Sequence, residues 1–277
     1  MENLVIGVDG GGSKTHAVLL NQNGEIIDES FSSSANIRTN VDLAYLSITA
    51  VIEKLVKQYQ IPLQLLEIGV GVAGYSVTAN LHILQRRLEA KYPQVKLQSD
   101  CHIACLAAHH GQDGAILICG TGVVGYVIKN GTVQQIGGWG FPHGDLGGGA
   151  WLGLEVCQLV CKAADQVIPW SELLKAVYRK FNQNYAEYKL WLLNATPGDF
   201  ADIARYIPDF MTTDVNARRI FARGMREIKR YLTILQRQGL TLKLVGGLAQ
   251  FYLGPLIEGF PDLTISDTAP ALGATYL

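Results

Sequence analysis

The chain has 277 residues, a formal net charge of −1, 48% hydrophobic and 17% charged residues. This composition is typical of a globular protein of one large domain or two ordinary ones, and the charge gives no reason to expect a nucleic-acid partner. No apolar run reaches the roughly 18 residues of a membrane-spanning helix. The first residues contain neither a basic leader nor the apolar core of a signal peptide, so we expect a cytoplasmic protein.

The first half of the sequence predicts a three-stranded meander followed by alternating helices and strands. Apolar runs at 4–9, 17–20 and 26–27 are separated by a glycine cluster and by an Asn-Gly turn, a spacing typical of antiparallel strands. The elements expected beyond the meander are a helix at 41–58, a strand ending near Gly71, a helix at 78–91, a strand at 95–99 and a helix at 101–110.

The second half repeats this order of elements and adds helices. The elements expected are strands at 115–119, 126–128 and 133–136, a helical region at 149–238, a strand at 242–245, a helix, a strand near 263–265 and a closing helix. Within the helical region, Thr196 is expected to cap a helix that starts at Pro197. Both halves therefore read βββαβαβα, which predicts an α/β fold of two lobes, 1–110 and 111–277.

Each half places glycines directly after its first strand. The two loops are Asp9-Gly10-Gly11-Gly12-Ser13-Lys14 and Gly120-Thr121-Gly122. Glycine lets a ligand approach backbone N–H groups closely, and successive N–H groups in such a turn bind anions such as phosphate. Tight hairpin turns alone are the alternative, but three consecutive glycines and a matching second loop favour phosphate. A third pair, Gly246-Gly247, lies between a strand and a helix, a junction that can receive a nucleotide.

Two common nucleotide motifs do not fit these loops. A P-loop needs Gly-Lys-Ser/Thr before a helix, but Ser13 separates Gly12 from Lys14 and residues 16–20 read as a strand. Residues 120–125 match GxGxxG, yet they continue into a strand and a hairpin. The helix that should bind a dinucleotide pyrophosphate is therefore missing.

Three aspartates lie close to these glycine loops. Asp9 closes the first strand, Asp100 follows the strand at 95–99, and Asp145 lies in a glycine-rich loop before a helix. Phosphoryl transfer needs a carboxylate near Mg²⁺ and a second carboxylate that accepts the proton of the attacking hydroxyl. Asp9 and Asp100 are candidates for these two carboxylates. The alternative for an aspartate in such a place is a helix N-cap, for which Asp100 and Asp145 are well suited.

Two further features are interpreted as structural. Cys101 and Cys105, like Cys157 and Cys161, are four residues apart, but no CxxC and no matching histidine spacing accompanies them. Buried free thiols are therefore favoured over a metal site. A helix at about 217–238 carries seven basic residues against one glutamate, which we interpret as a solvated face rather than a nucleic-acid or phosphate strip.

The glycine loops and aspartates together resemble one known family. Residues 6–15 are similar to the first phosphate motif of the superfamily of sugar kinases, actin and chaperone ATPases. Further segments follow in the order expected of its BadF/BadG/BcrA/BcrD-type ATPase branch: Gly71-Val72-Ala73-Gly74, Ser99-Asp100, Gly120-Thr121-Gly122, Gly138-Trp139-Gly140, Gly144-Asp145, Ala150-Trp151-Leu152-Gly153 and Val245-Gly246-Gly247. This branch includes N-acetylglucosamine kinase and bacterial glucosamine kinase. The resemblance implies two ribonuclease H-like lobes that close over ATP, as in actin-like ATPases.

The resemblance also implies ligands and the residues that bind them. The activity implied is an ATP-dependent kinase of glucosamine or N-acetylglucosamine, with Asp9 near Mg²⁺ and Asp100 as general base on the 6-hydroxyl. The phosphate residues implied are Gly10, Gly11, Gly12, Ser13, Lys14, Gly120, Thr121 and Gly122; Gly246 and Gly247 lie against the adenosine, and Asn36, Gly138, Trp139, Gly140 and Asp145 line the sugar pocket. Relatives of this kind suggest a homodimer, and neither nucleic acid nor membrane is an implied partner.

The chain departs from the branch pattern beside the expected sugar site. Val123 follows Gly122 where a serine is usual, and Leu146 and Gly148 stand where glutamate and serine are usual. These changes concern the identity of the sugar more than nucleotide binding, and they leave a non-catalytic sugar or nucleotide sensor as an alternative. A second alternative is an ATPase that activates a partner reductase through a bridging iron–sulfur cluster. The placement of the cysteine pairs in expected helices argues against it.

Overall fold

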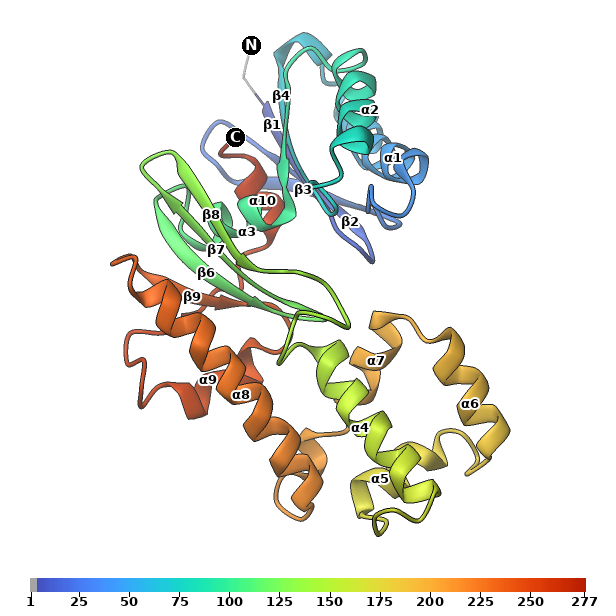
Figure 1. Ribbon diagram of the computed structural model, residues 1–277. Coiled ribbons are helices and arrows are strands. Elements are labelled where there is room, and N and C mark those ends of the chain that lie inside the picture. The colour runs from blue at the N-terminus through green and yellow to red at the C-terminus, as the bar shows by residue number, and fades with distance from the viewer. Residues whose placement is uncertain (1–3) are drawn as a thin grey trace. The chain divides into compact units, whose positions relative to one another are not determined.

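A computed structural model of the protein describes residues 4–277 (Figure 1). It contains two five-stranded sheets flanked by helices, which confirms the α/β class expected from the sequence. Contacts within the chain divide it into two compact units. The first unit comprises the described residues up to Gly114 together with 128–132 and 267–277, and the second comprises 115–127 and 133–266. The expected lobe ranges, 1–110 and 111–277, stay a prediction.

The first sheet is formed by strands from the first half of the sequence. Its strands are β1 (Leu4–Gly10), β2 (Thr15–Leu20), β3 (Ile26–Ser32), β4 (Leu66–Val72) and β5 (Val95–Ser99). The order across the sheet is β3-β2-β1-β4-β5, in which β1 pairs antiparallel with β2 and parallel with β4. The Asn-Gly turn joins β2 to β3, with Gly24 at a φ of 77° that suits glycine.

Helices of the first unit bury apolar faces against this sheet. They are α1 (Val41–Tyr59), α2 (Thr78–Glu89), α3 (Asp100–Ala108) and α10 (Pro270–Ala274), with a short 3₁₀ turn at Leu63–Leu65. The side chain of Asn40 caps α1 by accepting a 2.9 Å hydrogen bond from the Leu43 N–H. Residues of α1 at helical spacing are fully buried: Ala44, Ile48, Val51, Ile52 and Leu55.

Helix α10 returns from the far end of the sequence and lies in backbone contact with β1, β4 and α3 (Figure 1). A Cβ on Gly7 or Gly69 would lie only 2.0 or 1.8 Å from a carbonyl oxygen of α10. A Cβ on Gly273 of α10 would lie 1.8 Å from the carbonyl oxygen of Ile103 in α3. These three glycines are required because any larger residue would separate the backbones.

We expect Gly69→Ala to lower the free energy of unfolding by about 1–3 kcal/mol, because the added methyl group forces α10 away from β4. Gly254→Ala is the matched control, since a Cβ at this helical position meets no atom within 4 Å. Chemical denaturation of both variants measures the difference. An unchanged midpoint for Gly69→Ala would contradict the close contact.

The second sheet belongs mainly to the second unit. Its strands are β6 (Gly114–Cys119), β7 (Val123–Lys129), β8 (Thr132–Gly137), β9 (Leu242–Val245) and β10 (Thr264–Ile265), in the order β10-β9-β6-β7-β8. Strand β6 pairs parallel with β9, and β9 pairs parallel with β10. Because 15–20 and 123–129 are strands, neither glycine loop leads into the helix that a P-loop or a dinucleotide fold requires.

Six helices and a short 3₁₀ turn follow in the described part of the second unit. They are α4 (Gly149–Ala164), α5 (Glu172–Arg179), α6 (Tyr185–Asn194), α7 (Pro197–Ala204), α8 (Val215–Gln236) and α9 (Ala249–Leu256), with the turn at Pro208–Phe210. The expected cap at Thr196 is confirmed, and Asp199 completes a capping box with it. Helices α4 and α7 touch at Gly153, where a Cβ would lie 1.8 Å from the Phe200 carbonyl oxygen.

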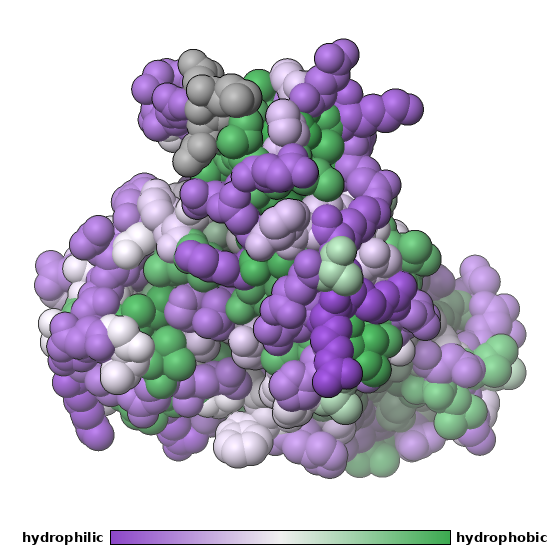
Figure 2. All heavy atoms as spheres, turned by 90° about the horizontal axis from the view of Figure 1, so that it is seen from above, coloured by the Kyte–Doolittle hydropathy of each residue, from purple (hydrophilic) through white to green (hydrophobic). Residues whose placement is uncertain are grey.

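The surface and the cysteines agree with a globular protein. Hydrophilic and hydrophobic side chains are interspersed on the face shown in Figure 2. Within residues 4–277, no helix combines the length and apolar composition needed to cross a bilayer. All five cysteines are free thiols; Cys105, Cys119 and Cys157 are buried, whereas Cys101 and Cys161 are half-buried.

Candidate functional site

Asp9 lies near the carboxyl end of β1, in the interior of the first sheet. It faces His16 of β2 on one side and Gly71 of β4 on the other. Burial, and to a smaller extent the negative charge of Asp100, raise the pKa of the Asp9 carboxyl from 3.8 to about 6, although the Lys14 ammonium opposes this rise. A carboxylate in this environment is stabilised by a bound cation, because a cation offsets both burial and the second negative charge.

Asp100 begins α3 directly after β5, and it is not the N-cap of that helix. The cap is Ser99, whose hydroxyl accepts a 3.1 Å hydrogen bond from the His102 N–H. The Asp100 carboxylate accepts a 2.9 Å hydrogen bond from the Cys101 N–H. Burial raises the pKa of Asp100. The capping alternative is therefore wrong for Asp100, which leaves a half-buried acid that the helix start does not require.

The loop between β1 and β2 is a tight turn that adjoins these acids. The Gly11 N–H donates a 3.0 Å hydrogen bond to the Lys14 carbonyl oxygen, which closes the turn. A Cβ on Gly10 would lie 3.0 Å from a backbone oxygen of β4, so this glycine has a packing role. A Cβ on Gly12 would meet the Nδ2 atom of Asn36 at 4.0 Å, and Ser13 is exposed. The structure thus brings Asp9, the 10–14 loop and Asn36 together in the first unit.

The loop at 120–122 joins β6 to β7 and receives the start of α4. The Gly149 and Ala150 N–H groups donate to the carbonyl oxygens of Gly120 and Thr121 at 2.8 and 3.0 Å. A Cβ on Gly122 would lie 2.4 Å from the Asp145 Oδ2 atom, so the Asp145 carboxylate packs against this loop. A Cβ on Gly120 would meet no atom within 4 Å.

The expected sugar residues of the second unit lie in one loop, 137–148. Gly138 and Gly140 adopt φ values of 69° and 89°, and between them Trp139 is 85% exposed. Asp145 also has a positive φ, 59°. It is not a helix cap, because the N-cap of α4 is Gly148. The capping alternative is therefore wrong for Asp145 as well.

The glycine pair after β9 has two different physical explanations. Gly246 has a φ of 99°, and a Cβ there would lie 2.6 Å from the Cys119 carbonyl oxygen, so the backbone itself requires glycine. Gly247 has no such constraint, since a Cβ there meets nothing within 4 Å. Gly247 and Gly120 therefore leave open space beside the backbone, which fits the close approach of a nucleotide.

The donor set also fits Mg²⁺ held jointly with phosphates. The described residues contain no group of three or more His, Cys, Asp or Glu side chains arranged around a metal position. Mg²⁺ does not require such a cage, because it is usually bound by one or two carboxylates, water and substrate phosphates. Asp9, with Asp100 close enough to raise its pKa, is a fitting carboxylate.

The structure adds residues to the site that the sequence alone did not indicate. The Tyr252 hydroxyl donates a 2.6 Å hydrogen bond to the Gly147 carbonyl oxygen. Burial and the Asp145 charge raise the pKa of Tyr231, which places this phenol near Asp145. Neither tyrosine belongs to a motif, and no spacing in the sequence connects either of them to residues 137–148.

The two departures from the family pattern are apolar side chains that pack. Val123 is 1% exposed in the core of the second unit, and Leu146 is partly buried against the same core. The hydroxyl and the acid that are usual at these positions are thus replaced by contacts that support the loops.

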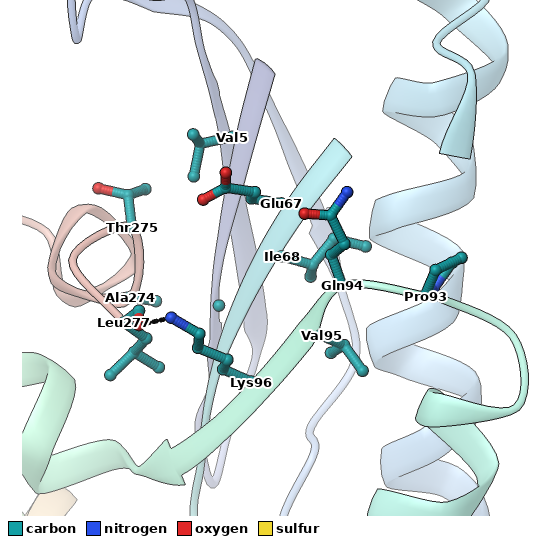
Figure 3. A pocket seen from close by; sticks show the side chains of 11 residues that line it. Val5, Glu67, Ile68, Pro93, Gln94, Val95, Lys96, Ala274, Thr275 and Leu277 are labelled. Carbon is teal, nitrogen blue, oxygen red and sulfur yellow. Dashed lines mark hydrogen bonds between the residues drawn. The ribbon is translucent and has the colours of Figure 1, made fainter. Parts of the chain in front are cut away.

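A cavity of about 410 Å³ opens elsewhere in the first unit (Figure 3). It lies at the amino ends of β4 and β5, where Glu67 and Val95 line it, and Lys96 donates a hydrogen bond to the Leu277 carbonyl oxygen beside it. Asp9 lies toward the opposite, carboxyl end of β1, and Asp100 follows the carboxyl end of β5. The cavity therefore has no part in the candidate site.

Comparison with known proteins identifies the family. The model of the BadF/BadG/BcrA/BcrD ATPase family matches residues 6–274. Glucosamine kinase of Vibrio cholerae is 30% identical over 264 residues, which cover 92% of this chain and 90% of that protein. N-acetylmuramic acid/N-acetylglucosamine kinase of Clostridium acetobutylicum is 26% identical over 88% of this chain and 85% of its own.

A solved structure agrees in fold with the whole chain. It is that of a candidate N-acetylglucosamine kinase from Chromobacterium violaceum, with a TM-score of 0.90 and 27% identity over 99% of this chain and 98% of that chain. The two-sheet fold and the order of the motifs agree with the family match. The chain therefore belongs to the BadF/BadG/BcrA/BcrD ATPase family.

Proposed function

We propose that this protein is an ATP-dependent kinase that phosphorylates the 6-hydroxyl of an amino sugar, glucosamine or N-acetylglucosamine. The observation that carries the proposal is the pair of half-buried carboxylates Asp9 and Asp100, of which Asp9 begins the 10–14 glycine loop and Asp100 lies close enough for its negative charge to raise the pKa of Asp9. Both curated relatives named above are kinases of amino sugars. The homodimer and the cytoplasmic location expected from the sequence remain predictions.

In the proposed reaction, backbone N–H groups of the 10–14 and 120–122 loops bind the ATP phosphates, together with Ser13, Lys14 and Thr121. Gly246 and Gly247 adjoin the adenosine. Mg²⁺ at Asp9 neutralises charge on the phosphoryl group when it is bound. Asn36, Asp145 and the Gly138-Trp139-Gly140 segment bind the sugar.

Asp100 acts as the general base. Its carboxylate takes the proton of the sugar hydroxyl while the hydroxyl oxygen forms a bond to the γ-phosphorus. The bond from that phosphorus to the β–γ bridging oxygen breaks, and ADP leaves with the electron pair. Burial supports the role of Asp100 as base, because it raises the pKa of the carboxyl and so makes the carboxylate a stronger base near neutral pH.

The proposed function is tested by ATP turnover against glucosamine, N-acetylglucosamine, N-acetylmannosamine, glucose and mannose. We expect ADP release that depends on one or both of the first two sugars, with the sugar 6-phosphate identified by mass spectrometry. ADP release that no sugar stimulates would instead favour the reductase-activating ATPase. Nucleotide binding without turnover would favour the sensor.

Gly120→Ala and Gly247→Ala are expected to raise the KM for ATP by about tenfold or more while they leave the melting temperature unchanged. The added methyl groups meet no protein atom, so they can clash only with a ligand that approaches the backbone. Gly254→Ala is the matched control, because its Cβ position is equally open but lies outside the proposed loops. Equal KM values in all three variants would remove both glycines from the nucleotide site.

A further inference from the structure

The loop at 137–148 is anchored at several points within the second unit. Near its end, the Tyr252 hydroxyl binds the Gly147 carbonyl oxygen, and the Asp145 carboxylate lies against Gly122. Near its start, Phe141 packs against Phe200 of α7, with ring centroids 5.3 Å apart and planes tilted by 40°. Phe141 is two residues from the exposed Trp139, so this contact lies close to the part of the loop assigned to the sugar.

Phe200 is itself held firmly. Its side chain is 7% exposed, and its carbonyl oxygen lies against Gly153 of α4 so closely that no Cβ fits between them. Trp191 of α6 meets its ring edge-on at a centroid distance of 5.4 Å. Helix α7 therefore presents the Phe200 ring to Phe141 from a fixed backbone position, beside α4 in Figure 1.

The ring contacts continue from Phe200 into the other inserted helices. Trp191 contacts Phe181 at 5.0 Å, Phe181 contacts Tyr188 at 4.9 Å, and Tyr188 contacts Tyr178 of α5 at 5.7 Å. Helices α5, α6 and α7 thus form an aromatic cluster whose contact with the 137–148 loop is made through Phe200 and Phe141. The phosphate loop at 120–122 has no member in this row of rings.

We propose that α7 positions the sugar-binding part of the 137–148 loop through the Phe200–Phe141 contact. Phe141 and Phe200 are then positioning residues that set the affinity for the amino sugar. The physical reason is preorganisation: a loop already fixed in its binding conformation loses less conformational entropy when the sugar binds. This inference rests on the proposed function for its effect on sugar, but the anchoring itself is independent of catalysis.

The test compares Phe141→Leu and Phe200→Leu with the control Phe181→Leu. Phe181 belongs to the same aromatic cluster, but its ring contacts are with Trp191 and Tyr188. Leucine keeps the apolar character and removes the aromatic pair, which is expected to raise the KM for the sugar about 2- to 10-fold. The KM for ATP should change less than 2-fold. The double variant of Phe141 and Phe200 should show no further rise beyond the larger single effect, because both changes remove one shared contact.

A second measurement follows the loop directly by amide hydrogen exchange of a peptide covering residues 138–145. Exchange should be faster in Phe141→Leu and Phe200→Leu than in Phe181→Leu at equal free energy of unfolding. Phe141→Tyr, which keeps the aromatic ring, should show the exchange rate and the sugar KM of the wild type. Sugar KM values and exchange rates equal to those of the Phe181 control would overturn the proposal. If the wild-type protein phosphorylates no sugar, the proposed function fails, and the exchange rates still decide whether α7 anchors the loop.

Discussion

Asp100→Ala is expected to lower kcat for sugar phosphorylation by about 10²–10⁴-fold, the usual contribution of a general base. A sugar hydroxyl is a poor nucleophile at neutral pH, and the Asp100 carboxylate is the proposed acceptor of its proton. The affinity for ATP should change little, because phosphate binding is assigned to the glycine loops rather than to α3. Steady-state kinetics with saturating sugar and ATP give the comparison.

Ser99→Ala is the matched control, one residue away. It removes the hydroxyl that caps α3 and should lower the free energy of unfolding by about 0.5–2 kcal/mol, with kcat close to that of the wild type. Asp100→Ala should show the reverse pattern, with low kcat and little loss of stability. Full activity in Asp100→Ala would exclude Asp100 as the base.

Asp9→Asn is expected to reduce kcat by at least about 10³-fold, because it removes the carboxylate proposed to hold Mg²⁺ while charge develops on the transferred phosphoryl group. The amide has nearly the shape of the acid, so the fold should be retained. The remaining activity should not be restored by raising Mg²⁺. A variant with near wild-type kcat at ordinary Mg²⁺ would remove Asp9 from the mechanism.

The same variant should be more stable than the wild type in metal-free buffer above pH 6. The pKa of Asp9 in the folded protein is about 6, against an ordinary 3.8, so the folded state disfavours ionisation of this group. Below pH 4 the carboxyl is protonated in both states and this penalty vanishes. As pH rises from about 4 to 6 the wild type loses up to about 3 kcal/mol relative to Asp9→Asn, and the difference then stays constant.

Denaturation of both proteins at pH 4, 5, 6 and 7.5 measures this difference. Added Mg²⁺ with a nucleotide should stabilise the wild type more than the variant at pH 7.5. A constant stability difference between the two proteins over this pH range would contradict the buried, charge-repelled environment of Asp9.

Local patterns in the sequence predicted most elements of the fold. Alternating apolar runs and two Asn-Gly turns place the strands of both meanders, and Thr196 with Pro197 marks the start of α7 within the helical region. These features depend on neighbours within a few residues, so a single sequence contains them. The glycine loops could also be predicted from the sequence, because each one comes directly after a strand.

The rest depends on contacts between residues far apart in the sequence. The sequence does not reveal that Gly69 lies against the backbone of α10. It also does not reveal that Phe141 packs against Phe200. For Asp100, the sequence left a cap and a base as alternatives. The hydrogen bond between Ser99 and His102, which the sequence does not reveal, excludes the cap, and the role of Asp100 as base stays a prediction.

The position of α10 has a consequence for synthesis of the protein on the ribosome. The first sheet and α3 are translated early, but the helix that fills the contacts at Gly7, Gly69 and Ile103 is translated after both sheets. All residues of the second unit precede α10 in the sequence. The first unit therefore begins first and is completed last. Until residues 270–274 are translated, the surface of the first sheet that α10 covers stays exposed and accessible to chaperones.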